Sequence, residues 1–197
     1  MINKLVKIKR GSIDILLFGK KNQGKTLIQT MFGYLLFKKG YEIFTNYNVN
    51  FPHTRIKTLQ DLKNITELPY YKKKVFLGDD FERWINARLT RKNIDINSIT
   101  LDFGKSNCTT IVNCKRLLNI DIIYRMGVSY FIDVKLIKKF EPINNLEKRM
   151  INNYLNYYMI QLDIYDYYGD LVKTYIINNI QNYVNLFETI EKVKTYS

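Results

Sequence analysis

The sequence predicts an α/β fold in which a mainly parallel sheet is flanked by helices, with an antiparallel β-hairpin added near the C-terminus. Three observations support this. A glycine-rich turn at residues 19–26 joins an apolar run of strand length to a run of helical period. Short strands and helices then alternate, which is typical of parallel sheets with crossover helices. Two late β-branched runs flank a glycine-bearing turn, which predicts a hairpin at a sheet edge.

The glycine-rich turn, Gly19 to Thr26, fits the pattern G-x-x-x-x-G-K-[ST] of the phosphate-binding P-loop. Its glycines let the backbone curl around a β-phosphate so that several N–H groups point inward. Lys25 is expected to reach the β- and γ-phosphates of a nucleoside triphosphate, and the Thr26 hydroxyl to ligate Mg²⁺. The residues expected to contact the nucleotide are Gly19, Lys20, Lys21, Asn22, Gln23, Gly24, Lys25, Thr26 and Leu27.

The other elements follow in order after a basic lead-in. Strands are expected at residues 13–18, 41–45, 74–78, 108–113 and 128–134, and hairpin strands at 157–164 and 171–177. Helices are expected at 27–39, 59–65, 81–89, 94–101 and 183–193. No repeat or linker divides the chain, so we expect one P-loop ATPase domain over residues 1–197. Its core covers about 1–135, and a hairpin-and-helix extension covers about 136–197.

A second chemical signal is the apolar strand at 74–78 that runs directly into Asp79 and Asp80. This is the form of a Walker B element. Asp79 is expected to hold Mg²⁺ opposite Thr26, and Asp80 to orient or deprotonate the attacking water. The alternative is an ordinary cap between strand and helix, because aspartate is a favoured N-cap residue.

Cations surround these acids in the sequence. Arg88 and Arg91 follow the acidic pair, and phosphoryl transfer often needs an extra cation to neutralise developing charge. A solvated helix face explains any single one of these arginines better than catalysis does, but we expect at least one of the cluster to be catalytic. Lys115 and Arg116 follow the strand at 108–113, at the strand end that faces the nucleotide in open α/β sheets.

The composition limits the partners. The net charge of +13 and the pI near 9.6 favour a polyanionic partner such as nucleic acid or an anionic membrane surface, although a lysine-rich soluble surface would give the same charge. No run approaches the roughly 20 apolar residues of a membrane-spanning helix, and the N-terminus lacks a signal-peptide core, so we expect an intracellular protein. Cys108 and Cys114 are expected to be reduced, buried thiols.

Together these residues resemble the FtsK–HerA class of P-loop ATPases, specifically the short genome-packaging ATPases of viruses and the related Zot-like proteins. Only the P-loop match is sharp. The other segments that carry the resemblance are Gly40-Tyr41, the strand end Thr45-Asn46, Asp79-Asp80, Trp84 to Arg88, Cys114 to Asp121, Arg125 and Phe187 to Glu191.

Two positions depart from the family pattern. Asp80 stands where the family commonly has a catalytic glutamate, and its side chain is one methylene shorter, so Glu82 is an alternative. Lys115 stands where the family has a polar glutamine sensor. Asn113 would take that role if the register shifts by two, which keeps the same face of the strand. Arg125 matches a recurring arginine of the family.

The resemblance implies a Mg²⁺-dependent ATPase that translocates double-stranded DNA without base preference. Such a protein would act as a homo-oligomeric ring, associated with the viral capsid or in the host cytoplasm. The lack of a membrane span favours packaging over membrane-anchored extrusion. A nucleoside or nucleotide kinase is the alternative, although the paired acids suit water activation better. The hypothesis of a GTP-dependent switch has little support, because the guanine-recognition motif Asn-Lys-x-Asp is absent from the sequence.

Overall fold

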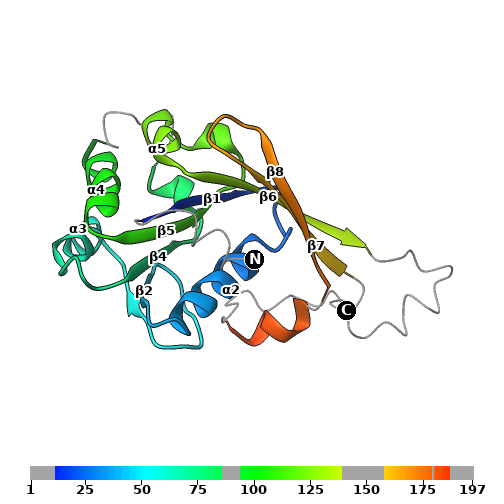
Figure 1. Ribbon diagram of the computed structural model, residues 1–197, viewed down its shortest axis with the longest axis horizontal. Helices are drawn as coiled ribbons and strands as arrows, with labels where there is room; N and C mark the ends of the chain where they lie inside the picture. Colours follow the sequence, from blue (N-terminus) through cyan, green and yellow to red (C-terminus); the bar gives the residue numbers. More distant parts are fainter. Residues whose placement is uncertain (1–11, 86–93, 139–157, 179, 187–197) are drawn as a thin grey trace.

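The computed structural model describes residues 12–85, 94–138, 158–178 and 180–186 (Figure 1). The strands are β1 (Asp14–Phe18), β2 (Glu42–Thr45), β3 (Thr54–Arg55), β4 (Lys74–Gly78), β5 (Cys108–Asn113), β6 (Tyr130–Lys138), β7 (Tyr158–Tyr165) and β8 (Leu171–Ile177). The α-helices are α2 (Lys25–Phe37), α3 (Leu59–Glu67), α4 (Ile94–Lys105) and α5 (Ile122–Gly127), and short 3₁₀ helices are η1 (Phe81–Arg83), η3 (Leu117–Asn119) and η5 (Ile180–Leu186). No helix among these residues is long and apolar enough to cross a membrane.

One eight-stranded sheet runs through the molecule in the order β3-β2-β4-β5-β1-β6-β7-β8. The strands from β3 to β6 are parallel, and β7 and β8 add antiparallel to β6, which confirms the predicted fold class. Strand β6 pairs with β1 only over Tyr130 to Asp133 and continues past the end of β1 to Lys138. The expected division of the chain near residue 135 therefore falls inside a strand.

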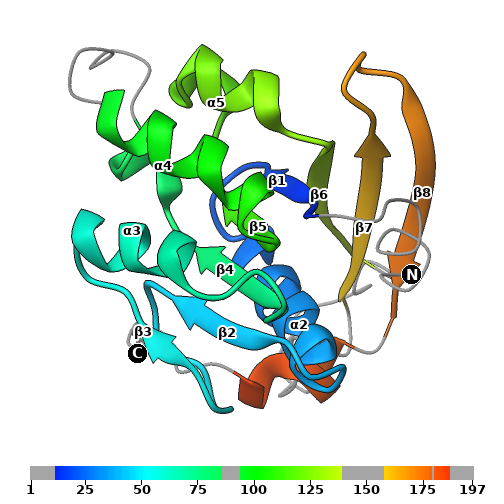
Figure 2. The same cartoon turned by 60° about the vertical axis from the view of Figure 1, so that its left-hand side comes forward.

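Helices cover both faces of the sheet (Figures 1 and 2). Helix α2 and η5 pack on one face, where Leu17 and Phe32 belong to the same buried cluster. Helices α3, α4 and α5 pack on the other face, where Leu16 and Phe76 belong to a second buried cluster. Because successive strand residues point to opposite faces, Leu16 and Leu17 enter different cores. Cys108 and Cys114 are both buried, as expected.

Two predicted helices were wrong in the part that the structure describes. In place of a helix from Phe81 there is one 3₁₀ turn, η1, because Asp80 is left-handed (φ 48°) and its side chain makes no N-cap hydrogen bond. The rest of that prediction lies outside the described residues. The last helix begins at Ile180 as a 3₁₀ helix, with Ile180 buried against the α2 core, and its predicted part after residue 186 lies outside the described residues.

The remaining differences are in length. Helix α4 continues to Lys105 and ends before Asn107, whose φ of 57° is the left-handed conformation that closes helices. Helix α3 begins at a capping box formed by Thr58 and Asp61. Strand β3, with two residues, is too short to show a periodic pattern and was missed by the sequence analysis.

Candidate nucleotide site

The P-loop lies between the end of β1 and the start of α2, and its glycines are needed where they stand. Gly19 (φ 142°) and Gly24 (φ 88°) both adopt positive φ, and a Cβ on Gly19 would come within 2.5 Å of the Val134 carbonyl oxygen. Gly24 is the N-cap of α2 and supplies no side-chain cap. The first amides of α2 therefore have no side-chain acceptor from the N-cap, which is the arrangement that binds anions at helix N-termini.

Lys25 already lies against the loop. Its Nζ donates to the carbonyl oxygens of Gly19 and Lys20, both at 2.8 Å. Burial lowers the pKa of Lys25, while the nearby carboxylates of Asp79 and Asp80 act in the opposite direction. The ammonium group is thus held at the turn that the sequence predicts will surround the phosphates.

Thr26 and Asp79 meet across the site. The Thr26 hydroxyl, on α2, donates to Asp79 Oδ1 at 2.9 Å, at the carboxyl end of β4. A hydroxyl and a carboxylate are hard oxygen donors of the kind that Mg²⁺ takes when phosphates and water complete its shell. Over the described ranges there is no cluster of three or more His, Cys, Asp or Glu that would hold a metal without a nucleotide. The Thr26 hydroxyl and the Asp79 carboxylate by their chemistry fit Mg²⁺ shared with a nucleotide.

Asparagines from the strands on either side of β4 fix the acidic pair. Asn46, just after β2, accepts from the Asp79 N–H at 2.7 Å and donates to the Asp79 carbonyl at 2.9 Å. Asn113, at the end of β5, accepts from the Asp80 N–H at 3.0 Å and donates to Asp79 Oδ1. Buried Gln29 of α2 accepts from Asn113 at 2.6 Å.

Asp80 and Glu82 have different surroundings. The Asp80 carboxylate is partly exposed and lies 3.1 Å from Arg83 Nη2 and 3.9 Å from Lys115 Nζ. Glu82 Oε2 accepts from the Lys115 backbone N–H at 3.0 Å and from Asn119 Nδ2 at 3.1 Å, and its Oε1 lies 3.5 Å from Lys115 Nζ. Burial acts to raise the pKa of Glu82, but these hydrogen bonds outweigh it and hold that pKa below its usual range.

The other expected cations are distributed differently. Arg125, on α5, donates from Nε to the Ile120 carbonyl at 3.1 Å, so it braces the turn before its own helix. Arg88 and Arg91 lie outside the described residues. Asn113, one of the two alternatives for the sensor, contacts both acidic residues. Lys115, the other alternative, approaches Asp80 with its ammonium group and contacts Glu82 with both its ammonium group and its backbone N–H.

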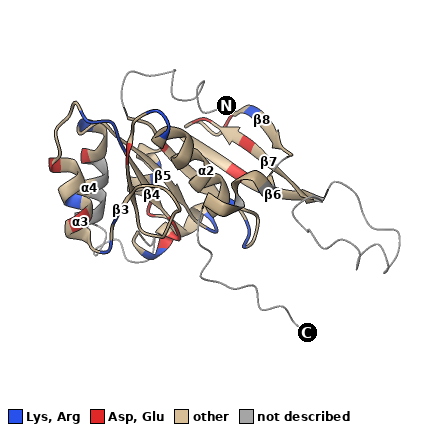
Figure 3. Ribbon diagram, turned by 90° about the horizontal axis from the view of Figure 1, so that it is seen from below, with Lys and Arg blue, Asp and Glu red and all other residues tan. Residues whose placement is uncertain are grey.

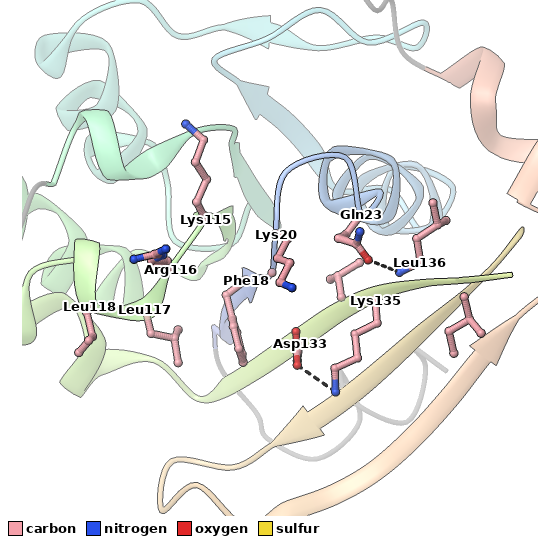
Figure 4. Close-up of a pocket in the computed structure, with 13 residues that line it drawn as sticks. Phe18, Lys20, Gln23, Lys115, Arg116, Leu117, Leu118, Asp133, Lys135 and Leu136 are labelled. Atoms are coloured by element: carbon pink, nitrogen blue, oxygen red, sulfur yellow. Dashed lines mark hydrogen bonds and ion pairs between the residues drawn. The ribbon is translucent and has the colours of Figure 1, made fainter.

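Two cavities adjoin the site. The larger, about 1050 Å³, opens between the P-loop entry, the 115–118 turn and the second half of β6 (Figure 4). Its walls are mostly apolar, Asp133 and Lys135 form an ion pair at 3.1 Å, and the Gln23 side chain accepts from the Leu136 N–H at 2.6 Å. Figure 4 shows Lys115 pointing away from β6. The smaller cavity, about 430 Å³, lies on the β2–β3 side of the acidic pair and is lined by Arg55, Lys57 and Arg83 among others.

Sequence reasoning missed Asn46, Gln29, Arg55 and Lys57. A usable signal existed for Asn46 alone, because it directly follows β2, and parallel strand ends meet at one edge of the sheet.

Solved structures share this fold. The N-terminal domain of zonular occludens toxin from Neisseria meningitidis matches with a TM-score of 0.60 and 14% identity, covering 90% of this chain and 100% of that one. B204, the DNA-packaging ATPase from Sulfolobus turreted icosahedral virus, matches with a TM-score of 0.56 and 16% identity, covering 86% and 98%. The genome-packaging NTPase B204 of Sulfolobus turreted icosahedral virus 2 in complex with AMPPCP matches at 0.51 and 14%, covering 84% and 97%.

The chain therefore has the fold of a P-loop NTPase. At the level of fold, the likeness to Zot and to the viral packaging ATPases confirms the resemblance drawn from the sequence. No protein-family model and no curated protein sequence matches the chain.

Proposed function

We propose that this chain is an ATP-hydrolysing motor that moves double-stranded DNA, acting as a viral genome-packaging ATPase in a ring of identical subunits. The observation that carries the proposal is the Thr26–Asp79 contact of 2.9 Å beside a P-loop, because it joins a phosphate cradle to a magnesium ligand pair. The structural neighbours, a DNA-packaging ATPase and a Zot domain, supply the biological context.

The P-loop residues would bind the phosphates of ATP. The backbone N–H groups between Gly19 and Thr26, together with the start of α2, provide the anion-binding surface. Lys25 would exchange its hydrogen bonds to loop carbonyls for phosphate oxygens. Thr26 and Asp79 would hold Mg²⁺, which when bound neutralises charge on the β- and γ-phosphates.

Water activation is assigned to Asp80. Its carboxylate is partly exposed beside the cradle, whereas the Glu82 carboxylate accepts hydrogen bonds from the 115–119 turn and has little freedom to serve a water. Asp80 Oδ would accept a proton from the water or align it by hydrogen bonding. Glu82 is then a positioning residue that keeps Lys115 near the site.

Asn113 is assigned the sensor role. Its amide links Asp79 and Asp80 to Gln29, so it couples the two acids to the helix that carries Thr26. Lys115, with Glu82 and Asp80 as partners, would add positive charge beside the transferring phosphoryl group. Arg88, Arg91 and Arg125 remain candidates for cations that complete the site of a neighbouring subunit.

Duplex DNA is the proposed partner because the chain carries a net charge of +13 and a translocase must hold phosphates without reading bases. A kinase is the second candidate, since the small cavity lined by Arg55, Lys57 and Arg83 would accept a phosphorylated acceptor beside Asp80.

Steady-state hydrolysis of ATP, measured with and without two unrelated duplexes, tests the proposal. We expect duplex of either sequence to stimulate turnover, and the protein to assemble into a larger oligomer with an ATP analogue. Lys25→Ala is the control for contaminating ATPase. If DNA does not change the rate of ATP hydrolysis and an added nucleoside or nucleotide is phosphorylated, the motor proposal is wrong and the kinase proposal is supported.

A further inference from the structure

A loop that the nucleotide site does not use lies at the opposite end of the sheet. Residues 70–73, Tyr-Tyr-Lys-Lys, lead into the N-terminal end of β4, whereas the acidic pair follows its C-terminal end. Tyr70 is 63% exposed and Tyr71 is 81% exposed, and Lys73 is also exposed. Large aromatic side chains are usually buried, so two adjacent exposed tyrosine rings beside lysines indicate a binding surface.

Hydrogen bonds from buried or neighbouring side chains fix the backbone of this loop. Lys74 is fully buried, and its Nζ donates to the carbonyl oxygens of Leu68 at 3.0 Å and Pro69 at 3.2 Å. Asn107, after α4, donates to the Tyr70 carbonyl at 3.2 Å. Burial of the Lys74 ammonium group costs free energy that its carbonyl acceptors offset. The rings are therefore presented on a fixed backbone, which reduces the entropy lost when a ligand binds.

A second pair of lysines adjoins this loop. Lys38 and Lys39 directly follow α2. The chain then enters β2 through Tyr41, whose ring lies 5.9 Å from Lys73 Nζ. The Glu42 N–H donates to the Lys73 carbonyl at 2.9 Å, so the two segments are joined side by side. Much of the blue in Figure 3 lies in the connections at the ends of the sheet. We call residues 38–41 and 70–73 together the basic edge.

We propose that the basic edge binds single-stranded DNA without sequence preference. Lys72 is paired with Glu42 at 2.8 Å, so Lys38, Lys39 and Lys73 would contact phosphates. Tyr70 and Tyr71 would stack on unpaired bases, as aromatic rings do in non-specific single-strand binding surfaces. The inference rests on the proposed function for its choice of nucleic acid as partner. It adds a strand-contacting surface far from the nucleotide and implies contact with frayed or unpaired segments as well as duplex.

The chain contains a matched control. The β7–β8 turn carries a second exposed pair, Tyr167 and Tyr168, at 50% and 86% exposure, but between Asp166 and Asp170. The same dipeptide therefore occurs once among lysines and once among aspartates. If tyrosines stack on the bases of a polyanion, the pair among lysines should bind and the pair among aspartates should not, because negatively charged aspartates repel phosphates.

Fluorescence anisotropy of the full chain with a labelled oligothymidylate is the test. Tyr71→Ala is expected to weaken binding roughly 5- to 100-fold, the range for loss of one stacked base, while Tyr168→Ala leaves it unchanged. Lys39→Ala and Lys73→Ala should each reduce the slope of log affinity against log salt by about 0.7, and Lys173→Ala should not. Circular dichroism checks the fold, and DNA-stimulated or basal ATPase checks the distant site.

Equal losses for Tyr71→Ala and Tyr168→Ala, or no loss for either, would overturn the inference while leaving the proposed motor intact. The same holds for binding of duplex but not of oligothymidylate. Failure of the wild type to bind any DNA would remove both this surface and the DNA partner of the proposed function. Photocrosslinking of wild-type complexes gives an independent readout: cross-links on residues 70–73 support the inference, and cross-links on residues 166–170 contradict it.

Discussion

The two sides of the nucleotide site are built by different means. On the P-loop side, a continuous segment from Gly19 to Thr26 makes the geometry with its own backbone, and its positive-φ residues lie within that segment. On the acidic side, Asp79 and Asp80 depend on amide side chains from the ends of β2 and β5, far away in the sequence. The first side is specified locally, and the second exists only after the sheet has formed.

This difference predicts that nucleotide binding and hydrolysis depend on different sides of the site. A local loop can bind phosphate as soon as its backbone is in place, whereas the acids gain their alignment from strands that could shift relative to one another. We therefore expect changes on the P-loop side to damage both steps, and changes on the acidic side mainly to damage hydrolysis. The following substitutions test that division.

Lys25→Ala should have the largest effect. Removal of the ammonium group takes away a charge stabiliser of the transferring phosphoryl group, so hydrolysis should fall on the order of 10²–10³-fold or more. Nucleotide binding should weaken as well, and circular dichroism should show an unchanged fold. Steady-state ATPase and equilibrium binding of an ATP analogue measure the two effects. Turnover close to wild type would end the assignment of this loop as the phosphate cradle.

Asp80→Asn should come next. Loss of the base should reduce hydrolysis by roughly 10²–10⁴-fold, while analogue binding stays near the wild-type level. Glu82→Gln is the matched comparison, because it keeps an acceptor for the 115–119 turn and should retain much more activity. The reverse ranking, with Glu82→Gln inactive and Asp80→Asn active, would exchange the two roles.

Asn113→Ala and Asn46→Ala should each lower hydrolysis roughly 10- to 100-fold, as the loss of outer-shell partners does in metalloenzymes. Each also leaves a backbone N–H of the acidic pair without its acceptor, which should cost about 1–3 kcal/mol of unfolding free energy. Denaturant unfolding and single-turnover hydrolysis separate the two effects. If analogue affinity falls as far as hydrolysis, the proposed separation of the two sides is wrong.

The smallest effect concerns acid stability. The folded-state pKa of Glu82 is lowered, so its contribution to stability is present above its ordinary pKa and is lost as the pH falls through the lowered value. Glu82→Gln should therefore reduce stability near neutral pH by about 1 kcal/mol and change it little in strong acid. Urea unfolding at several pH values measures this, and a pH-independent difference would contradict the charge-based account.

Prediction from sequence succeeded where the signal was local. The strand, P-loop and helix from residue 13 onward, the strand before Asp79 and the late hairpin all have patterns confined to a few neighbouring residues. The turn after Asp80 was predicted wrongly because Asp80 adopts a left-handed backbone conformation. Its N–H donates to Asn113, which lies 33 residues later, so no local sequence pattern indicates the contact. Gln29 was missed for the same reason, whereas Asn46 was given no site role although its place directly after β2 offered a signal.

The second half of β6 carries a further consequence. Beyond Asp133 no described strand pairs with the side of β6 that faces β1, so within the described ranges this stretch is a strand edge next to the P-loop. Open edges invite pairing with strands of other molecules. Gln23 accepts from the Leu136 N–H and so occupies part of that edge with a side chain. A P-loop side chain thereby takes the place of a strand at Leu136, so this N–H is not open to pairing with another chain.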